Sequence, residues 1–325
     1  MLRHLLTIIL FVPLLSFSQK MKGICFSSPK NEIQKGDIQE IADMNANWIG
    51  FVPYAYIDSG KVLYDLDIQW KGERIEEIRK GIQFAHELGL KVMIKPDVWI
   101  LDGSYTGRYS PPNNDWETLE NGYFTYLQKL LQLAIEEEVE LLCLGSEWGR
   151  FAKNRPSFWG HLIAEVRKQY KGLVSYCANW DDFESFPFWE QMDLIGIDWY
   201  APIATTSNAK FKSLLKGWKK NTKSLQAYYE KTGKKIFFPE FGFKSTERSV
   251  VKPWQFEDDS AESEEAQNNG FKTYFKTIWK KDWYAGGFVW EWYADHDEES
   301  GFPRETDYTP QGKLAEQTIR EGYRN

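Results

Sequence analysis

Two apolar runs of this sequence each end in a single glutamate. The run ELLCLGS leads to Glu147, and the run KIFFP leads to Glu240. A lone glutamate at the end of a strand usually pairs with a nearby lysine or arginine. Two carboxyl groups held about 5–5.5 Å apart can instead cleave a glycosidic bond with retention of configuration, one as nucleophile and the other as acid and then base. This chemistry requires a fold that brings both glutamates to one place.

The elements around these glutamates alternate regularly between strand and helix. Eight short runs rich in β-branched and aromatic residues occur at residues 21–27, 48–56, 91–99, 140–148, 172–180, 193–202, 235–243 and 286–293. Amphipathic stretches such as 74–90 and 118–139 separate them, with Gly89 and Gly233 as helix stop signals. Parallel strands need crossover helices, so this alternation predicts a single α/β domain, a (β/α)8 TIM barrel over residues 19–325.

The carboxyl ends of the strands carry the chemistry in such barrels. The fourth and seventh runs lie roughly across the barrel from each other, so we predict that Glu147 and Glu240 converge as the catalytic pair. Gly145 and Ser146 are expected to leave room for a substrate. Carboxylates and indoles share the same strand ends, and the predicted substrate-binding residues are Lys95, Trp99, Ser146, Asn179, Trp180, Asp198, Tyr200, Trp290 and Trp292.

The aromatic candidates can bind sugars or fill the core. Neighbouring residues of a strand point to opposite faces, so Trp290 is predicted to point into the barrel and Glu291 toward the helix layer or a contact at the rim. Trp99, Trp180 and Trp254 have flat rings that match the C–H face of a pyranose. Each of these three taken alone is equally suited to packing.

The polar candidates also have two interpretations each. Lys95 and Asp97 are equally suited to binding substrate hydroxyls and to pairing at the strand ends. Asp198 is better suited to orienting other polar groups than to reacting. Asn179 is suited to a hydroxyl contact and equally to a cap or turn.

Several motifs resemble clan A of the retaining glycoside hydrolases. The nucleophile strand of that clan is similar to FFPEFGF, and its acid/base strand is similar to CLGSEW. Within the clan, glycoside hydrolase family 113, the β-mannanase-like family, is most similar in three further motifs: KP-D-W, IGIDWYAP and GGFVWEWY. The resemblance implies that Glu147 is the general acid/base and Glu240 the nucleophile. It also implies that Tyr200 hydrogen-bonds the nucleophile and that Trp290 floors the adjoining sugar subsite. Many clan members have Asn, which contacts the sugar 2-hydroxyl, at the position of Ser146.

The resemblance implies a retaining β-glycoside hydrolase that acts on a β-linked polysaccharide or oligosaccharide, with β-1,4-mannan as the first candidate. The same mechanism acting on β-glucan or another cell-wall glycan is the second interpretation. A non-catalytic carbohydrate-binding barrel is the third, and the presence of both glutamates disfavours it. Residues 100–116 and 244–263 form long loops that can build cleft walls or a lid, so endo and exo action both stay open.

Composition limits the partners and the location. The 325-residue chain has a formal net charge of −7, which disfavours nucleic acid as a partner, and we expect carbohydrate as the partner instead. The sequence has no metal-type cluster and no cofactor motif, so we expect no metal and no cofactor. Residues 1–18 are typical of a signal peptide, which predicts a secreted or periplasmic protein without a membrane anchor, and we expect a monomer. Cys25, Cys143 and Cys177 lie in apolar runs and are predicted to be buried free thiols.

Overall fold

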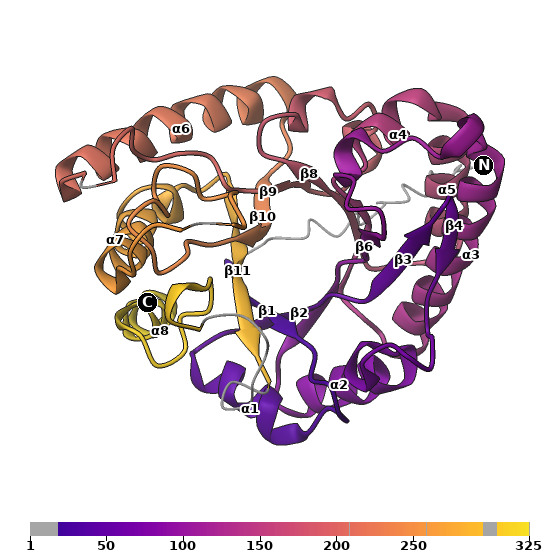
Figure 1. Ribbon diagram of the computed structural model, residues 1–325, viewed down its shortest axis with the longest axis horizontal. Coiled ribbons are helices and arrows are strands. Elements are labelled where there is room, and N and C mark those ends of the chain that lie inside the picture. The colour runs from indigo at the N-terminus through magenta and orange to yellow at the C-terminus, as the bar shows by residue number, and fades with distance from the viewer. Residues whose placement is uncertain (1–18, 208, 258, 295–303, 325) are drawn as a thin grey trace, which may run out of the picture.

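The computed structural model describes residues 19–207, 209–257, 259–294 and 304–324. Within these residues, eight parallel strands close into a barrel in the order β1-β11-β10-β9-β8-β7-β5-β2 (Figure 1). The barrel strands are β1 (Met21–Ser27), β2 (Trp48–Phe51), β5 (Lys91–Ile94), β7 (Leu141–Ser146), β8 (Leu173–Asn179), β9 (Ile195–Asp198), β10 (Ile236–Phe241) and β11 (Tyr284–Tyr293). The predicted (β/α)8 barrel is confirmed, with one barrel strand in each of the eight runs.

Two of the predicted strands are in fact divided. Residues 48–56 and 91–99 contain Pro53 and Pro96, and proline has no N–H to donate to a strand ladder. After each proline the chain leaves the barrel and forms a second strand. These strands and a third make a separate sheet in the order β4-β3-β6, with β3 (Tyr54–Asp58), β4 (Lys61–Leu63) and β6 (Asp97–Ile100).

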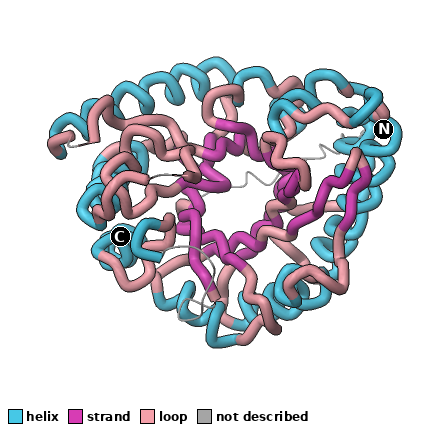
Figure 2. The backbone as a smooth tube through the Cα atoms, in the orientation of Figure 1, coloured by secondary structure: helices cyan, strands magenta, loops and turns pink. Residues whose placement is uncertain are grey.

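The α-helices of the described chain surround the barrel, as the outer ring of cyan tube in Figure 2 shows. They are α1 (Lys35–Asp43), α2 (Ile75–Glu87), α3 (Trp116–Glu136), α4 (Gly149–Asn154), α5 (Pro156–Gln169), α6 (Phe211–Thr232), α7 (Glu264–Lys276) and α8 (Leu314–Arg324). Ile78, Ile82 and Ala85 form the buried stripe of α2. Gly233 ends α6 with a left-handed φ of 70°, which confirms the predicted stop signal.

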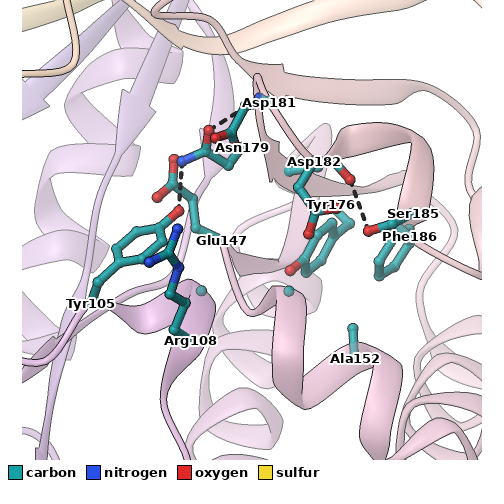
Figure 3. Close-up of a pocket in the computed structure, with 13 residues that line it drawn as sticks. Tyr105, Arg108, Glu147, Ala152, Tyr176, Asn179, Asp181, Asp182, Ser185 and Phe186 are labelled. Atoms are coloured by element: carbon teal, nitrogen blue, oxygen red, sulfur yellow. Dashed lines mark hydrogen bonds between the residues drawn. The ribbon is translucent and has the colours of Figure 1, made fainter.

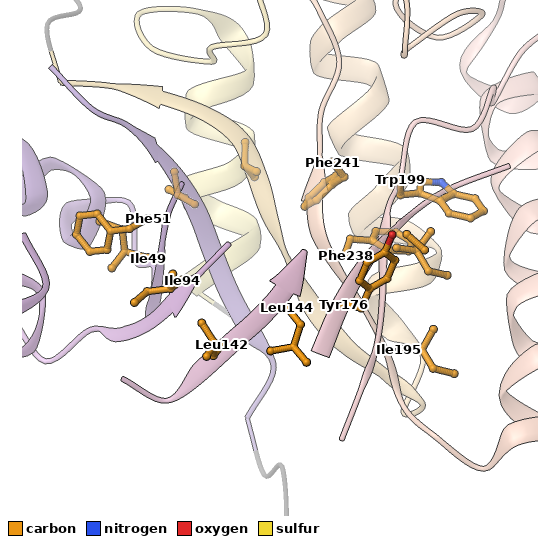
Figure 4. Close-up of a cluster of buried hydrophobic side chains, with 14 of the residues drawn as sticks. Ile49, Phe51, Ile94, Leu142, Leu144, Tyr176, Ile195, Trp199, Phe238 and Phe241 are labelled. Atoms are coloured by element: carbon orange, nitrogen blue, oxygen red, sulfur yellow. The ribbon is translucent and has the colours of Figure 1, made fainter. Parts of the chain in front are cut away.

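The hydrophobic core has two layers. One layer fills the barrel itself and includes Met21, Cys25, Trp48, Met93, Leu141, Cys143, Cys177, Phe237 and Phe288. The larger layer lies between the strands and the helices, and Figure 4 shows part of it. Each buried Leu, Ile or Phe stabilises the fold by about 1.5–3 kcal/mol, so both layers hold the strand ends firmly. The three cysteines are buried and free, as predicted.

The predicted signal peptide, residues 1–18, lies outside the described residues. Among the helices that the structure describes, none combines the length and the apolar character needed to cross a bilayer.

Candidate active site

Glu147 follows β7 at an irregularity of that strand. Leu141 and Cys143 point into the barrel, but the pairing of β7 with β8 shifts register between Cys143 and Ser146. A bulge of this kind re-aims the side chains that follow it, and it turns Ser146 and Glu147 toward the mouth of the barrel. Glu147 itself has a φ of 52°, a left-handed conformation that is uncommon for a residue with a side chain.

Gly145 does not leave room for a substrate, so that prediction was wrong. A Cβ atom at this position would lie 2.7 Å from Tyr123 Oη and 3.0 Å from the ring of Trp159. These two residues belong to α3 and α5, so the glycine allows close packing of the strand against the helix layer. The bulge has turned this position outward.

Glu240, on β10, has two hydrogen-bonding groups on its carboxylate. Lys95 Nζ lies 2.9 Å from Oε2, and Tyr200 Oη donates to Oε1 at 2.5 Å. The hydrogen bond expected of Tyr200 is therefore present. The Glu240 side chain is 14% exposed, so the carboxylate remains open to a ligand on one side.

Lys95 connects the buried polar groups beneath the site. Its ammonium group also lies 3.1 Å from Asp97 Oδ2 and donates to Ser146 Oγ at 3.1 Å. Ser146 Oγ in turn donates to Asp198 Oδ2 at 3.2 Å. The three N–H groups of Lys95 thus have acceptors on Glu240, Asp97 and Ser146, which favours pairing of Lys95 and Asp97 over contact with a substrate.

The network is buried, which changes the interpretation of three predicted substrate contacts. Lys95, Ser146 and Asp198 have exposed fractions of 0%, 3% and 1%, so they lie below the surface of the candidate site. Burial lowers the pKa of Lys95, but the charges of Asp198, Asp97 and Glu240 outweigh this effect and raise it well above its usual value. Burial raises the pKa of Asp198 well above its usual range.

Glu147 has a different electrostatic environment from Glu240. Burial raises the pKa of Glu147 from 4.5 to about 7, and the negative charge of Glu240 acts in the same direction. The charge of Lys95 and the neighbouring phenol of Tyr105 act in the opposite direction. A carboxyl group with a pKa near neutrality is suited to donate and then accept a proton.

The end of β11 places Trp290 and Glu291 as predicted. The Trp290 ring packs against the apolar layer inside the barrel, with Lys95 Nζ 5.8 Å from its centroid. Glu291 accepts hydrogen bonds from Ser27 Oγ and Tyr293 Oη at the rim between β1 and β11. Burial raises the pKa of Glu291 to about 8. The peptide bond between Trp290 and Glu291 is cis.

Trp292 is not part of the site. Its indole N–H donates to Glu40 Oε2 of α1 at 3.1 Å, and the side chain is buried in the outer core layer. The ladder between β1 and β11 matches Ile24 with Val289 and Phe26 with Trp292, so β11 carries one extra residue in this interval. That bulge reverses the alternation of faces and turns Trp292 toward the helices.

A loop residue that sequence reasoning missed lies next to Glu147. Tyr105, from the loop after β6, accepts a hydrogen bond from Asn179 Nδ2 at 2.6 Å, and both side chains line one cavity with Glu147 (Figure 3). An aromatic residue in a long loop on the catalytic face was the available sequence signal for Tyr105.

The centroids of the Trp180 ring and the half-exposed Trp254 ring lie 5.3 Å apart.

Trp99 lies on β6 of the outer sheet, opposite Tyr56, and is 58% exposed. The structure therefore places it outside the barrel strands, on the same strand as Asp97. Within the described residues, no group of His, Cys, Asp and Glu side chains is arranged to hold a metal ion.

A closed parallel barrel that gathers two glutamates, an ammonium group and a tryptophan at the carboxyl ends of its strands defines the class of barrel glycoside hydrolases. The model of Glycoside Hydrolase Family 113 matches residues 26–313, and the chain belongs to this family. The resemblance predicted from the strand-end motifs is thus confirmed, and the protein is a glycoside hydrolase.

Solved structures agree with this fold. The GH113 β-mannanase AaManA from Alicyclobacillus acidocaldarius, in complex with ManMIm, is 24% identical, with a TM-score of 0.80 over 95% of this chain and 98% of that one. A GH113 β-1,4-mannanase complex is 22% identical, with a TM-score of 0.81 over 94% and 99%. The β-glucuronidase of Faecalibacterium prausnitzii is more distant, at 16% identity and a TM-score of 0.63 over 94% of this chain and 49% of that one. No curated protein sequence matches.

Proposed function

We propose that this glycoside hydrolase is a secreted, monomeric enzyme that cleaves β-1,4-mannan, or oligosaccharides derived from it, by double displacement with retention of configuration. Membership of family 113 supports the reaction class. The fold shared with two solved structures of GH113 β-1,4-mannanase supports mannan as the first substrate to test.

The contrast between the two glutamates carries this proposal. Glu240 has an ammonium group and a phenol on its carboxylate, which suit an ionised nucleophile. Glu147 has a pKa raised by burial to about 7, which suits a proton donor at neutral pH. Two carboxyl groups whose environments differ in this way can divide the roles of nucleophile and acid/base.

In the first step, a Glu240 oxygen attacks the anomeric carbon while Glu147 gives its proton to the glycosidic oxygen, which leaves with the other sugar. In the second step, the ionised Glu147 takes a proton from water, and the oxygen of that water displaces Glu240 from the anomeric carbon. Tyr200 and Lys95 hold Glu240 in place, and Trp290 offers a flat face to the sugar ring.

Chemical rescue tests the role of Glu240. The Glu240→Ala variant, assayed with an activated aryl β-mannoside, should lose hydrolysis and regain turnover with azide, giving the glycosyl azide of inverted anomeric configuration. Undiminished hydrolysis without azide would end the assignment. Glu147→Ala should reduce cleavage of poor leaving groups more than that of activated aryl groups, and an equal loss for both would argue against an acid role.

The substrate is tested by reducing-sugar release from mannan, glucomannan, cellulose and laminarin, beside a double Glu147/Glu240 alanine variant. Ser146 makes this panel informative, because its hydroxyl is engaged by Lys95 and Asp198 and leaves the sugar 2-hydroxyl to other groups or to water. Release from cellulose or laminarin alone would move the proposal to a β-glucan. Binding without release by the wild type would indicate a carbohydrate-binding barrel.

Secretion is tested by expressing the full chain in a bacterial host with an export pathway. Cleavage after Ser18 should yield an exported protein whose first residue is Gln19, as read by mass spectrometry. An unprocessed chain retained inside the cell would contradict the signal-peptide assignment. Light scattering of the mature protein tests the monomer.

A further inference from the structure

The hydroxyl of Tyr293, at the end of β11, lies between two carboxyl groups. Its Oη atom is 2.8 Å from Glu291 Oε1 and 2.8 Å from Asp307 Oδ2. The other oxygen of Glu291 accepts a hydrogen bond from Ser27 Oγ. The other oxygen of Asp307 accepts one from the Tyr308 N–H at 2.6 Å. Glu291 and Asp307 are 8% and 7% exposed, so the protein itself must satisfy most of their hydrogen bonds.

A count of protons shows that one of these carboxyl groups is neutral. The single proton of the Tyr293 hydroxyl can be donated to only one of them. The other carboxyl group must donate its own proton to Tyr293 Oη, because two oxygens without a proton between them repel each other at 2.8 Å. Burial and the charges of Glu291 and Asp307 raise the pKa of Tyr293, so the phenol keeps its proton. The two carboxyl groups therefore hold one proton between them.

The proton has two possible positions. If Tyr293 donates to Glu291, the neutral acid is Asp307. If Glu291 is the neutral acid, the hydrogen bonds run from Glu291 to Tyr293 and from Tyr293 to Asp307. Burial raises the pKa of Glu291 to about 8, and the charge of Asp307 is the next largest cause. Glu291 is therefore the neutral acid at pH 7.

The groups that face Glu291 come from several elements. The described titratable groups that interact with it lie on β1, β3, β10, β11 and the segment before α8, and they are Cys25, Tyr54, Glu240, Tyr293 and Asp307. Burial raises the pKa of Cys25 and of Tyr54, so both are neutral at pH 7. Lys313 lies beside Asp307 and donates to its backbone oxygen at 3.3 Å. Ionisation of Glu291 would thus add a negative charge that acts on Glu240.

The same hydrogen bonds hold the end of β11, which carries Trp290. The backbone N–H of Tyr293 donates to Gln311 Oε1 at 2.8 Å, and Gln311 Nε2 donates to the Tyr293 carbonyl oxygen at 2.9 Å. A Cβ atom on Gly242 would lie 2.5 Å from the Trp290 carbonyl oxygen, so this strand end packs directly against the residue that follows β10. A shift of the strand end would therefore move Trp290 relative to the nucleophile.

We propose that Glu291 is a positioning residue that acts as a neutral acid. It donates its proton to Tyr293, Tyr293 donates to Asp307, and these bonds keep Trp290 where it can meet the sugar ring. Loss of the proton leaves the hydroxyl between two carboxylates again, so catalysis should fail as Glu291 ionises, independently of the acid/base. The effect on catalysis rests on the proposed double-displacement function, whereas the sharing of the proton does not.

Urea unfolding tests the neutral acid without an assay of catalysis. Glu291→Gln keeps the shape of the side chain, donates to Tyr293 from its amide and does not ionise. The stability that the proton of Glu291 contributes to the wild type is fully present below pH 4.5 and is lost as the pH rises through about 8. The folding equilibrium constant of Glu291→Gln, divided by that of the wild type, should therefore rise about tenfold or more between pH 6 and pH 9. A constant ratio overturns the proposal.

Glu184→Gln is the matched control, because an exposed glutamate receives the same substitution. Its folding equilibrium constant, divided by that of the wild type, should stay within about twofold over this pH range. Burial lowers the pKa of Lys313 to about 8, so Lys313 titrates in the same range. It does so in the wild type and in both variants, and its contribution cancels in the ratios.

The burst of nitrophenol from 4-nitrophenyl β-mannobioside tests the effect on catalysis. All enzymes in this assay carry Glu147→Ala, which removes the ionisation of the acid/base, so the burst rate reports attack by Glu240. Tyr200 and Lys95 have raised pKa values and keep their protons at pH 9. About a tenth of Glu291 is neutral at that pH, so Glu291→Gln should give a burst about ten times as fast as its parent.

A second comparison at pH 7 separates the hydrogen bonds of Glu291 from its bulk. Glu291→Met, which has an unbranched side chain without these bonds, should slow the burst about tenfold, and Glu291→Gln should restore it. Tyr293→Phe, which removes the shared hydroxyl, should slow it in the same direction and replaces the methionine variant if that variant does not fold.

The outcomes separate this inference from the function beneath it. Bursts as fast as the parent's in Glu291→Met and Tyr293→Phe overturn the positioning role. A Glu291→Gln burst that falls in parallel with the parent's between pH 7 and pH 9 also overturns it. A wild type that releases no nitrophenol and cleaves none of the four polysaccharides overturns the proposed function and the positioning role with it. The unfolding ratio then still decides whether Glu291 is a neutral acid.

Discussion

Replacement of Glu147 by Gln should stabilise the protein at alkaline pH. Burial raises the pKa of Glu147 from 4.5 to about 7, so between these values the native state binds a proton that the unfolded chain has lost. The stability contributed by this carboxyl group is fully present below pH 4.5 and is lost as the pH rises through 7. Glutamine has the same shape and does not ionise, so the variant should not lose this stability.

The size of the effect follows from the pKa shift. At about 1.36 kcal/mol per pKa unit, a shift from 4.5 to about 7 corresponds to about 3 kcal/mol well above pH 7. Between pH 5 and pH 8, the gain from Glu147→Gln should grow by about 2–3 kcal/mol. The protein should thus gain stability at pH 8 while it loses hydrolysis, which is the trade-off expected at a catalytic group.

Urea unfolding of the wild type and of Glu147→Gln at pH 5 and pH 8 measures this difference. Glu184→Gln, on an exposed turn, is the control and should change the unfolding free energy little at either pH. The same change for Glu147→Gln at both pH values would refute the raised pKa, and with it the reason for choosing Glu147 as the acid.

Three further predictions concern the groups around the glutamates. Lys95→Met leaves the buried carboxylates without their cation and should cost about 3–5 kcal/mol in urea unfolding; a cost below about 1 kcal/mol would contradict a buried ion-pair network. Tyr105→Phe removes the phenol that favours the ionised form of Glu147, so the alkaline limb of kcat/KM should move to higher pH, and a shift to lower pH would exclude this role. Trp292→Phe loses the hydrogen bond to Glu40, so it should lower the free energy of unfolding by about 1 kcal/mol and change kcat/KM less than twofold. Loss of activity without loss of stability would show that Trp292 takes part in the site.

The barrel could be predicted from sequence because each strand is short, apolar and followed by a helix. The outer sheet could not be predicted in the same way, since residues on both sides of Pro53 and Pro96 are suited to strands. The prolines are visible in the sequence and mark where each barrel ladder stops. What the sequence does not contain is the pairing of β3 with β6, because that contact forms only after both strands have left the barrel.

The site could be predicted where the end of a strand decides the position of a side chain. The hydrogen bond of Tyr200 to Glu240 and the inward position of Trp290 agree with this reasoning. Gly145 and Trp292 were misplaced because a one-residue bulge precedes each, and a bulge leaves no periodic signal in an apolar run. Tyr105 was missed because its position depends on a tertiary contact with Asn179 and not on any local pattern.

The segment from Lys95 to Tyr105 reaches both of the glutamates that we propose to be catalytic. Its first residue touches Glu240, and its last lies beside Glu147, with β6 between them held in register against β3. An exchange of the loop for that of a relative should therefore change the environment of Glu147 alone if the exchanged segment begins after Ile100. A deletion before Ile100 would displace the neighbours of both glutamates together. The end of β6 therefore separates changes that affect Glu147 alone from changes that also disturb Glu240, the proposed nucleophile.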